Sequence, residues 1–147
     1  MTKEIKLDNW IAALRSGTYN QGRERLRLYE DSYCCLGVLC DIYDPKGWEQ
    51  KYNGYFWYDS SSLLPSNLES FVSSRTQDIL TTLNDRGASF SDIARILSDF
   101  YSWEELNENI RKDTFVNEDK TLSCLVSNRN RGIYLQNTTL RTGRFVG

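Results

Sequence analysis

The sequence contains no histidine. Without imidazole, the chain cannot build the Ser-His-Asp or Cys-His arrangements of nucleophilic catalysis. It also lacks the residue most used for zinc binding and for proton transfer near neutral pH. Any catalysis would have to depend on carboxylates, tyrosine, lysine or thiol. The composition therefore favours binding over catalysis, although it leaves enzymatic activity open.

Long hydrophobic runs are also missing, and proline occurs only twice. No segment approaches the roughly 18 apolar residues that a membrane-spanning helix needs. Residues 1–6 lack the apolar stretch of a secretory signal. We therefore expect a cytosolic protein with no membrane partner. A length of 147 residues predicts one domain that covers the whole chain, 1–147.

Four cysteines are present, and three of them, Cys34, Cys35 and Cys40, fall in one apolar run. This spacing does not match the paired Cys-x2–4-Cys motifs of zinc sites. A nucleophilic cysteine needs a nearby base or cation, and no histidine can serve as that base. We expect buried free thiols, with no metal and no cofactor.

Hydrophobic periodicity and capping signals predict a single α+β domain, in which helices pack with short antiparallel strands. The predicted helices cover residues 6–16, 33–43, 66–72, 74–84, about 90–100 and 103–112. The predicted strands are 25–29, a hairpin of 48–52 and 55–58 around Asn53-Gly54, and a C-terminal hairpin of 121–127 and 133–136. Asn-Gly predicts a type I′ turn, because both central residues of that turn need positive φ. Gly37 inside a predicted helix indicates a closely packed neighbour.

Four serines mark the starts of predicted helices: the turn Glu30-Asp31-Ser32 can supply a cap for 33–43, while Ser89 and Ser102 start capping boxes with Asp92 and Glu105. Ser74 and Gln77 form a further predicted box. Carboxylates at such positions stabilise helix starts. We therefore favour a structural role for them over a catalytic pair or a Mg²⁺ site.

Charge is distributed unevenly along the chain. Residues 44–119 carry seven bases and fourteen acids, whereas residues 120–147 carry five bases and no acid. A second basic feature is the alternating strand 25–29, which places arginines on one face. Arginine suits phosphate because its planar guanidinium donates hydrogen bonds in pairs, and tyrosine can stack on a base. The candidate ligand-binding residues are Tyr19, Arg23, Arg25, Arg27, Asn128, Arg129, Arg131, Tyr134, Arg141 and Arg144. The alternative is a solvated strand face, or pairing with acidic helices of the same or another copy.

Several segments recur together in a known family. They are Trp10, Ala13-Leu14-Arg15-Ser16-Gly17, Tyr19 with Gln21-Gly22, the run Tyr33-Cys34-Cys35-Leu36-Gly37-Val38-Leu39-Cys40-Asp41, Leu64-Pro65, and Leu83 to Gly87 with Ser89 to Ala94. Over about residues 5–100 the chain resembles small accessory proteins of tailed phages and prophages, and about 101–147 form a C-terminal extension. The resemblance implies a phage gene product outside the virion that acts on host physiology or host immunity.

These observations lead to one favoured function and two alternatives. The favoured function is non-enzymatic sequestration of a small anionic, nucleotide-derived host signal by a homo-oligomer. The first alternative is a protein–protein inhibitor that contacts a host protein through the aromatic hairpin Trp48 to Tyr58. The second is a metal-dependent nucleotide hydrolase. Duplex nucleic acid is not an expected partner, because the chain is acidic, with pI ≈ 5.2.

Overall fold

The computed structural model describes residues 4–51, 54–110, 115–116, 121–128 and 132–139. Its helices are α1 (Leu7–Arg15), α2 (Cys35–Tyr43), α3 (Ser74–Asp85), α4 (Phe90–Leu97) and α5 (Trp103–Asn109), with 3-10 turns η1 (Pro45–Gly47) and η2 (Ser66–Leu68). The strands are β1 (Asn20–Gln21), β2 (Arg27–Tyr29), β3 (Ser32–Tyr33), β4 (Trp48–Lys51), β5 (Gly54–Trp57), β6 (Phe115–Val116), β7 (Thr121–Asn128) and β8 (Gly132–Thr139). The predicted α+β fold class is confirmed.

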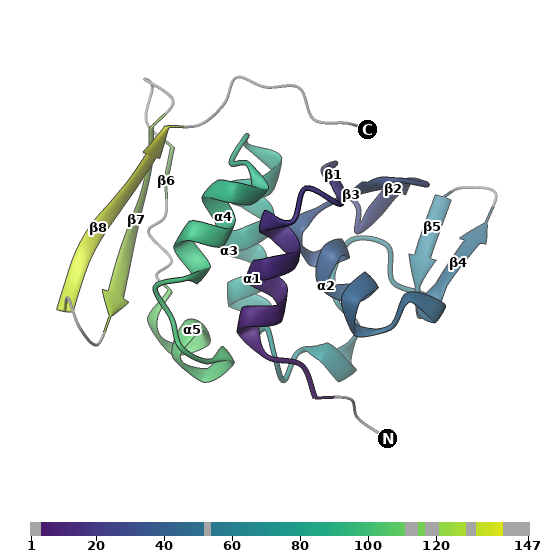
Figure 1. The fold of residues 1–147 in the computed structure, drawn as a ribbon, viewed down its shortest axis with the longest axis horizontal. Helices are drawn as coiled ribbons and strands as arrows, with labels where there is room; N and C mark the ends of the chain where they lie inside the picture. The colour runs from purple at the N-terminus through teal and green to yellow at the C-terminus, as the bar shows by residue number, and fades with distance from the viewer. Residues whose placement is uncertain (1–3, 52–53, 111–114, 117–120, 129–131, 140–147) are drawn as a thin grey trace.

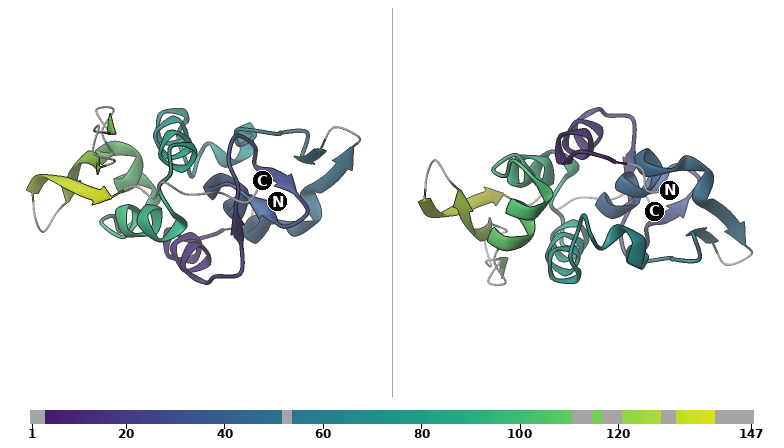
Figure 2. Two further views of the ribbon diagram at one scale, coloured as in Figure 1. Left: turned by 90° about the horizontal axis from the view of Figure 1, so that it is seen from above. Right: turned by 90° about the horizontal axis from the view of Figure 1, so that it is seen from below.

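The helices form the middle of the molecule, and small sheets lie at its two ends (Figures 1 and 2). Helix α1 packs against α4 and α2, while α3 packs against α2 and α4. The β4–β5 hairpin and the sheet β1-β3-β2 occupy one end, and the sheet β6-β7-β8 occupies the other. Among the described residues, no helix has the length and apolar character needed to cross a bilayer.

Two helices follow their sequence patterns closely. Helix α1 buries Leu7, Trp10, Ile11 and Leu14, which is the predicted apolar stripe, and Gly17 ends it at φ 76°. Helix α4 begins at the predicted capping box, in which Ser89 and Asp92 exchange side chain-to-backbone hydrogen bonds of 3.1 Å. These helices form because their local signals and their burial agree.

Other boundaries differ from the predictions. The N-cap of α3 is Ser73, one residue before the predicted Ser74, because Gln77 is buried and bonds Leu64 N and Val72 O instead of a helix cap. The predicted helix over 66–72 is only the 3-10 turn η2. Ser102 caps α5 as predicted, but α5 ends at Asn109; the predicted end at 112 lies outside the described residues.

The strands also depart from the predicted bounds. Only Arg27–Tyr29 of the predicted strand 25–29 forms β2, because Leu26 N donates to Ser61 O and Leu26 O accepts from Cys34 N. The aromatic hairpin is confirmed. Gly54, however, was predicted in the turn, and it instead begins β5 and pairs with Lys51. The connecting residues are therefore 52 and 53, which lie outside the described residues. The C-terminal hairpin is confirmed too, with Cys124 opposite Gln136.

Helix α2 is buried nearly all round, as predicted, but its cap is not local. Ser32 lies in β3, and the N-cap residue Cys34 makes no side-chain cap bond. The first helical N–H, of Cys35, instead donates to the side-chain Oδ1 of Asn84 at 3.2 Å. A residue 49 positions away therefore completes the start of this helix.

The buried amide of Asn84 connects α3 to the N-terminal third of the chain. Its Oδ1 also accepts from Gln21 Nε2 at 2.9 Å, and its Nδ2 donates to Gly22 O at 2.8 Å and to Asp85 Oδ1 at 3.3 Å. Gln21 in turn donates to Ala88 O and accepts from Phe90 N. The two amides thereby fix the loop after α1 against the corner between α3 and α4.

The close approach at Gly37 yields a test of helix packing. A Cβ built at Gly37 would lie 1.7 Å from Leu26 O. Helix propensity alone would favour Gly37→Ala by about 1 kcal/mol, but the backbone clash should reverse the sign. We expect a net loss of about 2 kcal/mol or more in the free energy of unfolding, measured by urea denaturation. The exposed Ser91→Ala in α4 is the control and should be neutral or slightly stabilising. A stabilised Gly37→Ala protein would contradict the packing described.

The Asn84 amide yields a second test, with a pH dependence. Asn84→Asp keeps the shape but turns Nδ2 into an acceptor that faces Gly22 O and Asp85 Oδ1. We expect a loss of about 3 kcal/mol at pH 7, because the buried carboxylate would place one of its two oxygens against two acceptors. Burial and Asp85 should raise the pKa of the new carboxyl above its unfolded value. Its protonated form can donate to Gly22 O, so the loss should be smaller at pH 4 and grow as pH rises.

Urea denaturation of both proteins at pH 4 and pH 7 would measure this difference. The control is Asn67→Asp at an exposed position of η2, which should change stability little at either pH. An equal loss for Asn84→Asp at both pH values would argue against the hydrogen bonds assigned to Asn84.

Candidate functional site

Arg27, one of the predicted anion-binding residues, is enclosed by aromatic rings. Its Cζ lies 4.2 Å from the ring centroid of Tyr55, 5.1 Å from that of Tyr33 and 5.3 Å from that of Trp48. Its Nε also donates to Glu30 O at 2.9 Å, and Nη2 donates to the same oxygen. The guanidinium is therefore bound by cation–π contacts and a backbone carbonyl of its own chain.

Arg25, two residues before Arg27, also stacks on an aromatic ring of the β4–β5 hairpin. Its Cζ lies 5.3 Å from the Phe56 ring centroid, and Lys51 Nζ lies 4.9 Å from the same centroid. Lys51 also pairs with Asp59 at 3.3 Å. Arg25 and Arg27 thus lie on one side of the chain, as predicted, but their side chains pack against aromatic rings of the β4–β5 hairpin.

Tyr19 and Arg23 lie beside this cluster and also contact the protein. Tyr19 Oη donates to Asp41 Oδ2 at 2.6 Å, and Trp48 Nε1 donates to Asp41 Oδ1 at 3.0 Å. Burial, followed by this hydrogen bond to a carboxylate, raises the pKa of Tyr19 well above its usual range. Arg23 Nη1 lies 3.5 Å from Asp85 O.

The remaining predicted ligand-binding residues belong to the other end of the molecule or lie outside the description. Asn128 ends β7 and Tyr134 lies in β8, far from β2 (Figure 1). Arg129, Arg131, Arg141 and Arg144 lie outside the described residues. The described part of the fold therefore brings Tyr19, Arg25 and Arg27 together near the β4–β5 hairpin, whereas Arg23 lies at the end of α3. It does not join them to the C-terminal hairpin.

Three of the thiols and two carboxylates of the described residues are buried or bonded within the fold. Cys34, Cys35 and Cys40 are free and buried, as predicted, and burial raises the pKa of the Cys34 thiol to about 12. Asp41 and Asp85 accept hydrogen bonds from the fold itself. Within the described ranges, no group of three or more Cys, Asp or Glu residues is placed to hold a metal ion.

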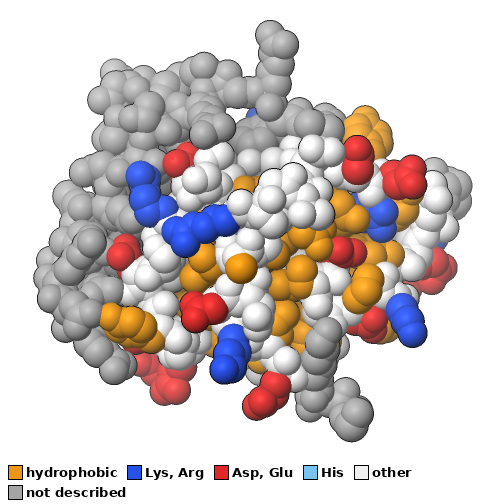
Figure 3. All heavy atoms as spheres, in the orientation of Figure 1, with side chains coloured by type: hydrophobic (Ala, Val, Ile, Leu, Met, Phe, Trp, Pro, Cys, Tyr) orange, Lys and Arg blue, Asp and Glu red, His pale blue; other side chains and the backbone are white. Residues whose placement is uncertain are grey.

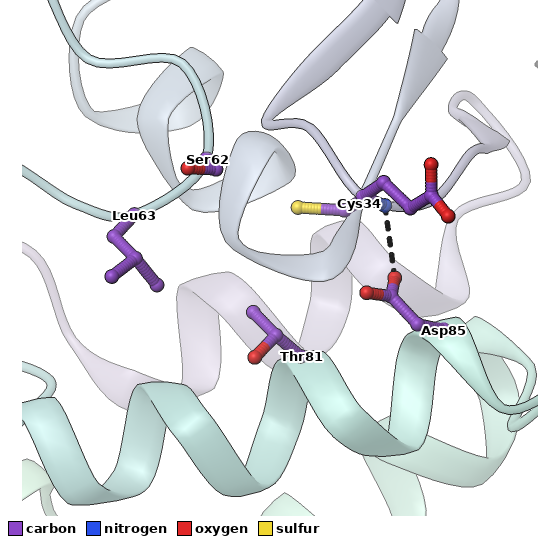
Figure 4. A pocket seen from close by; sticks show the side chains of 6 residues that line it. Cys34, Ser62, Leu63, Thr81 and Asp85 are labelled. Atoms are coloured by element: carbon purple, nitrogen blue, oxygen red, sulfur yellow. Dashed lines mark hydrogen bonds between the residues drawn. The ribbon is translucent and has the colours of Figure 1, made fainter.

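A small cavity lies beside Cys34, between α2, α3 and the loop before η2. Ser62, Leu63, Thr81 and Asp85 line it with Cys34, and Asp85 accepts the backbone N–H of Glu24 there (Figure 4). Its volume is about 180 Å³. That is less than the roughly 300 Å³ at which small-molecule pockets usually begin.

A larger cavity of about 650 Å³ lies between the start of α1 and the start of α5. Three aromatic side chains line it: Phe71, Tyr101 and Trp103. The Trp103 ring is held by its neighbours, since its centroid lies 5.7 Å from that of Trp10 and 5.4 Å from that of Phe71. Its Nε1 donates to Ile5 O at 2.8 Å. One wall of the cavity is therefore aromatic and held in place by packing. The volume of the cavity lies in the range that is usual for small-molecule ligands.

The polar lining of this cavity comes mainly from the segment that leads into α1. Glu4, Lys6, Asp8 and Asn9 line it on that side, and Ser102 on the other. Sequence reasoning did not find this site, because its two sides are almost 100 residues apart. The one available signal was the bulky Trp103 directly after a capping serine.

The aromatic enclosure of Arg27 can be tested by a substitution that keeps the charge. Arg27→Lys removes the planar face that stacks on Tyr55 and the paired donation to Glu30 O. We expect a loss of about 1–2 kcal/mol in the free energy of unfolding, measured by urea denaturation. The control Arg15→Lys alters an exposed arginine in the last turn of α1 and should change stability by less than about 0.5 kcal/mol. Equal stability of the two variants would show that the enclosure contributes little.

Comparison with known proteins gives one match. Residues 1–78 match a domain of unknown function, DUF8296. No curated protein and no solved structure matches the chain. The matched segment contains Gln21, Arg27 and the thiols of α2, whereas Asn84 and Trp103 follow it. Because the match covers more than half of the 147 residues, the chain belongs to the DUF8296 family.

Proposed function

We propose that this protein is a non-enzymatic phage accessory protein that binds a small nucleotide-derived ligand and withholds it from a host receptor. The observation that carries the proposal is the cavity of about 650 Å³ between α1 and α5. This volume falls within the range of about 300–1,000 Å³ that is usual for ligand pockets of proteins. The motifs shared with phage accessory proteins support the assignment to that class.

The aromatic wall favours a planar ring as the bound group. Trp103 and Phe71 are fixed by mutual packing, and Tyr101 at the rim has 60% of its surface exposed. Base–aromatic stacking contributes about 1–3 kcal/mol per base and tolerates different bases, because every base has a π-face. A nucleobase is therefore a suitable occupant.

Binding suits the described residues better than catalysis does. The thiols of α2 are buried, and burial raises their pKa, so that little thiolate forms near neutral pH. Asp41 is held by Tyr19 and Trp48, and Asp92 by the start of α4. These carboxylates stabilise the fold, and none of them lines the large cavity.

A protein–protein inhibitor is the second proposal, with fewer exposed contact residues than the hairpin sequence predicted. The aromatic hairpin was its expected contact, yet Trp57 is fully buried and Trp48 is bonded to Asp41. Among the described residues that follow the hairpin, Tyr58 is 51% exposed and Leu63 is 54% exposed, so these side chains are candidate anchors. Capture of one intact host protein by the immobilised chain, abolished by Tyr58→Ala and Leu63→Ala, would favour this alternative.

Ligand binding should be visible as thermal stabilisation. We expect at least one member of a panel of nucleosides and of linear and cyclic nucleotides to raise the Tm by about 5–10 °C at 100 times its Kd. Mass spectrometry of the small molecules released on denaturation should find a copurifying compound that contains a nucleobase. If no panel member shifts the Tm and no such compound is released, the proposed function is wrong.

A further inference from the structure

The charges around the large cavity restrict its ligand more than the aromatic wall does. Resting on the function proposed above, we infer that this cavity binds a planar ring of neutral or positive charge and discriminates against phosphate groups. The preferred ligand class is then a nucleoside or a related heteroaromatic compound. Its phosphorylated forms should bind more weakly.

The lining residues on the α1 side carry two carboxylates and one ammonium group. Glu4 and Asp8 are the acids and Lys6 is the base, and all three side chains are exposed to solvent. Among the described residues that line the cavity, none is an arginine. In the view of Figure 3, acidic and basic side chains both lie among the apolar side chains, so the charge at the cavity is decided by its own lining residues. A phosphate in the cavity would therefore meet a net negative charge.

The start of α1 does not compensate for these acids. A helix N-terminus favours anions through its free N–H groups and its dipole. Here Asp8 already places a carboxylate in the first turn, and Asn9 Oδ1 accepts the N–H of Lys6 at 2.9 Å. The positive potential of this helix start is thus partly neutralised by the chain itself.

Two of the arginines that were expected to hold phosphate, Arg25 and Arg27, lie away from this cavity. Arg25 and Arg27 stack on rings of the hairpin sheet, and β2 lies toward the opposite end of the helical layer from α5 (Figure 1). A ligand in the cavity cannot use them. Among the described lining residues, the oxygens of Glu4, Asp8, Asn9 and Ser102 can accept from the amino and imino edges of a heterocycle, and Lys6 can donate to its ring nitrogens or carbonyls.

The test uses two matched ligand series that share a ring and differ in charge. They are adenosine, AMP and ADP, and guanosine, GMP and GDP, titrated by isothermal calorimetry at low ionic strength. At about 6 Å in water, each carboxylate should weaken binding about threefold per unit of phosphate charge. We expect the nucleoside to bind most tightly in at least one series. A monophosphate carries a charge of about −1.5 to −2 at pH 7, so Glu4→Gln with Asp8→Asn should narrow the gap between nucleoside and monophosphate by about tenfold or more. Glu69→Gln with Asp78→Asn, two exposed acids outside the cavity lining, is the control and should leave the gap unchanged.

A second pair of variants tests the location. Tyr101→Ala removes a ring that lines the cavity and should weaken nucleoside binding by about tenfold. Tyr29→Ala removes a tyrosine of almost equal exposure, 58% against 60%, outside the lining and should leave binding unchanged. Phosphates that bind more tightly than their nucleosides would overturn this inference and leave the proposed function intact. Binding by neither series would overturn this inference, while the thermal-shift panel and the released compounds decide the proposed function separately. Equal losses in the two tyrosine variants would place the site elsewhere.

Discussion

The side-chain amide of Asn84 is the contact on which the arrangement of the N-terminal half depends. It is fully buried, and it joins α3 to the loop at Gln21-Gly22 and to the first turn of α2. An amide can do this because it offers donors and acceptors on one rigid plane. Removal of any partner would leave a buried polar group without a hydrogen bond, at a cost of about 1–3 kcal/mol. The motif segments around Gln21, Cys35 and Asn84 therefore meet at one point in space, although they are distant in the sequence.

Positive charge at the hairpin end is used mainly for packing. A guanidinium between aromatic rings keeps its charge in contact with solvent while its flat face covers apolar surface. Arg27 does this against Tyr55, and Arg25 does it against Phe56. The contacts attach β2 to a hairpin with which β2 shares no sheet. The basic pattern that suggests an anion site in the sequence is, in this part of the fold, also a means of holding two sheets together.

Much of the fold could be predicted from local patterns. The apolar stripe of α1, the capping box at Ser89, the buried helix with Gly37 and both hairpins follow from spacing and turn residues. Two of the errors share a cause, which is a tertiary hydrogen-bond partner in place of a local one. Gln77 bonds Leu64 and Val72 rather than a helix cap, and Asn84 rather than Ser32 completes the start of α2. The cavity could not be predicted either, because its aromatic wall depends on how Trp103 packs against Trp10 and Phe71.

The three buried thiols of α2 also have a practical consequence. Alkylating reagents and oxidants attack thiolates that they can reach, so Cys34, Cys35 and Cys40 are shielded both by their surroundings and by their raised pKa. They become reactive only when α2 separates from α3 and from the loop at Leu26. The rate of their alkylation would therefore measure how often the centre of the protein opens, with no added label.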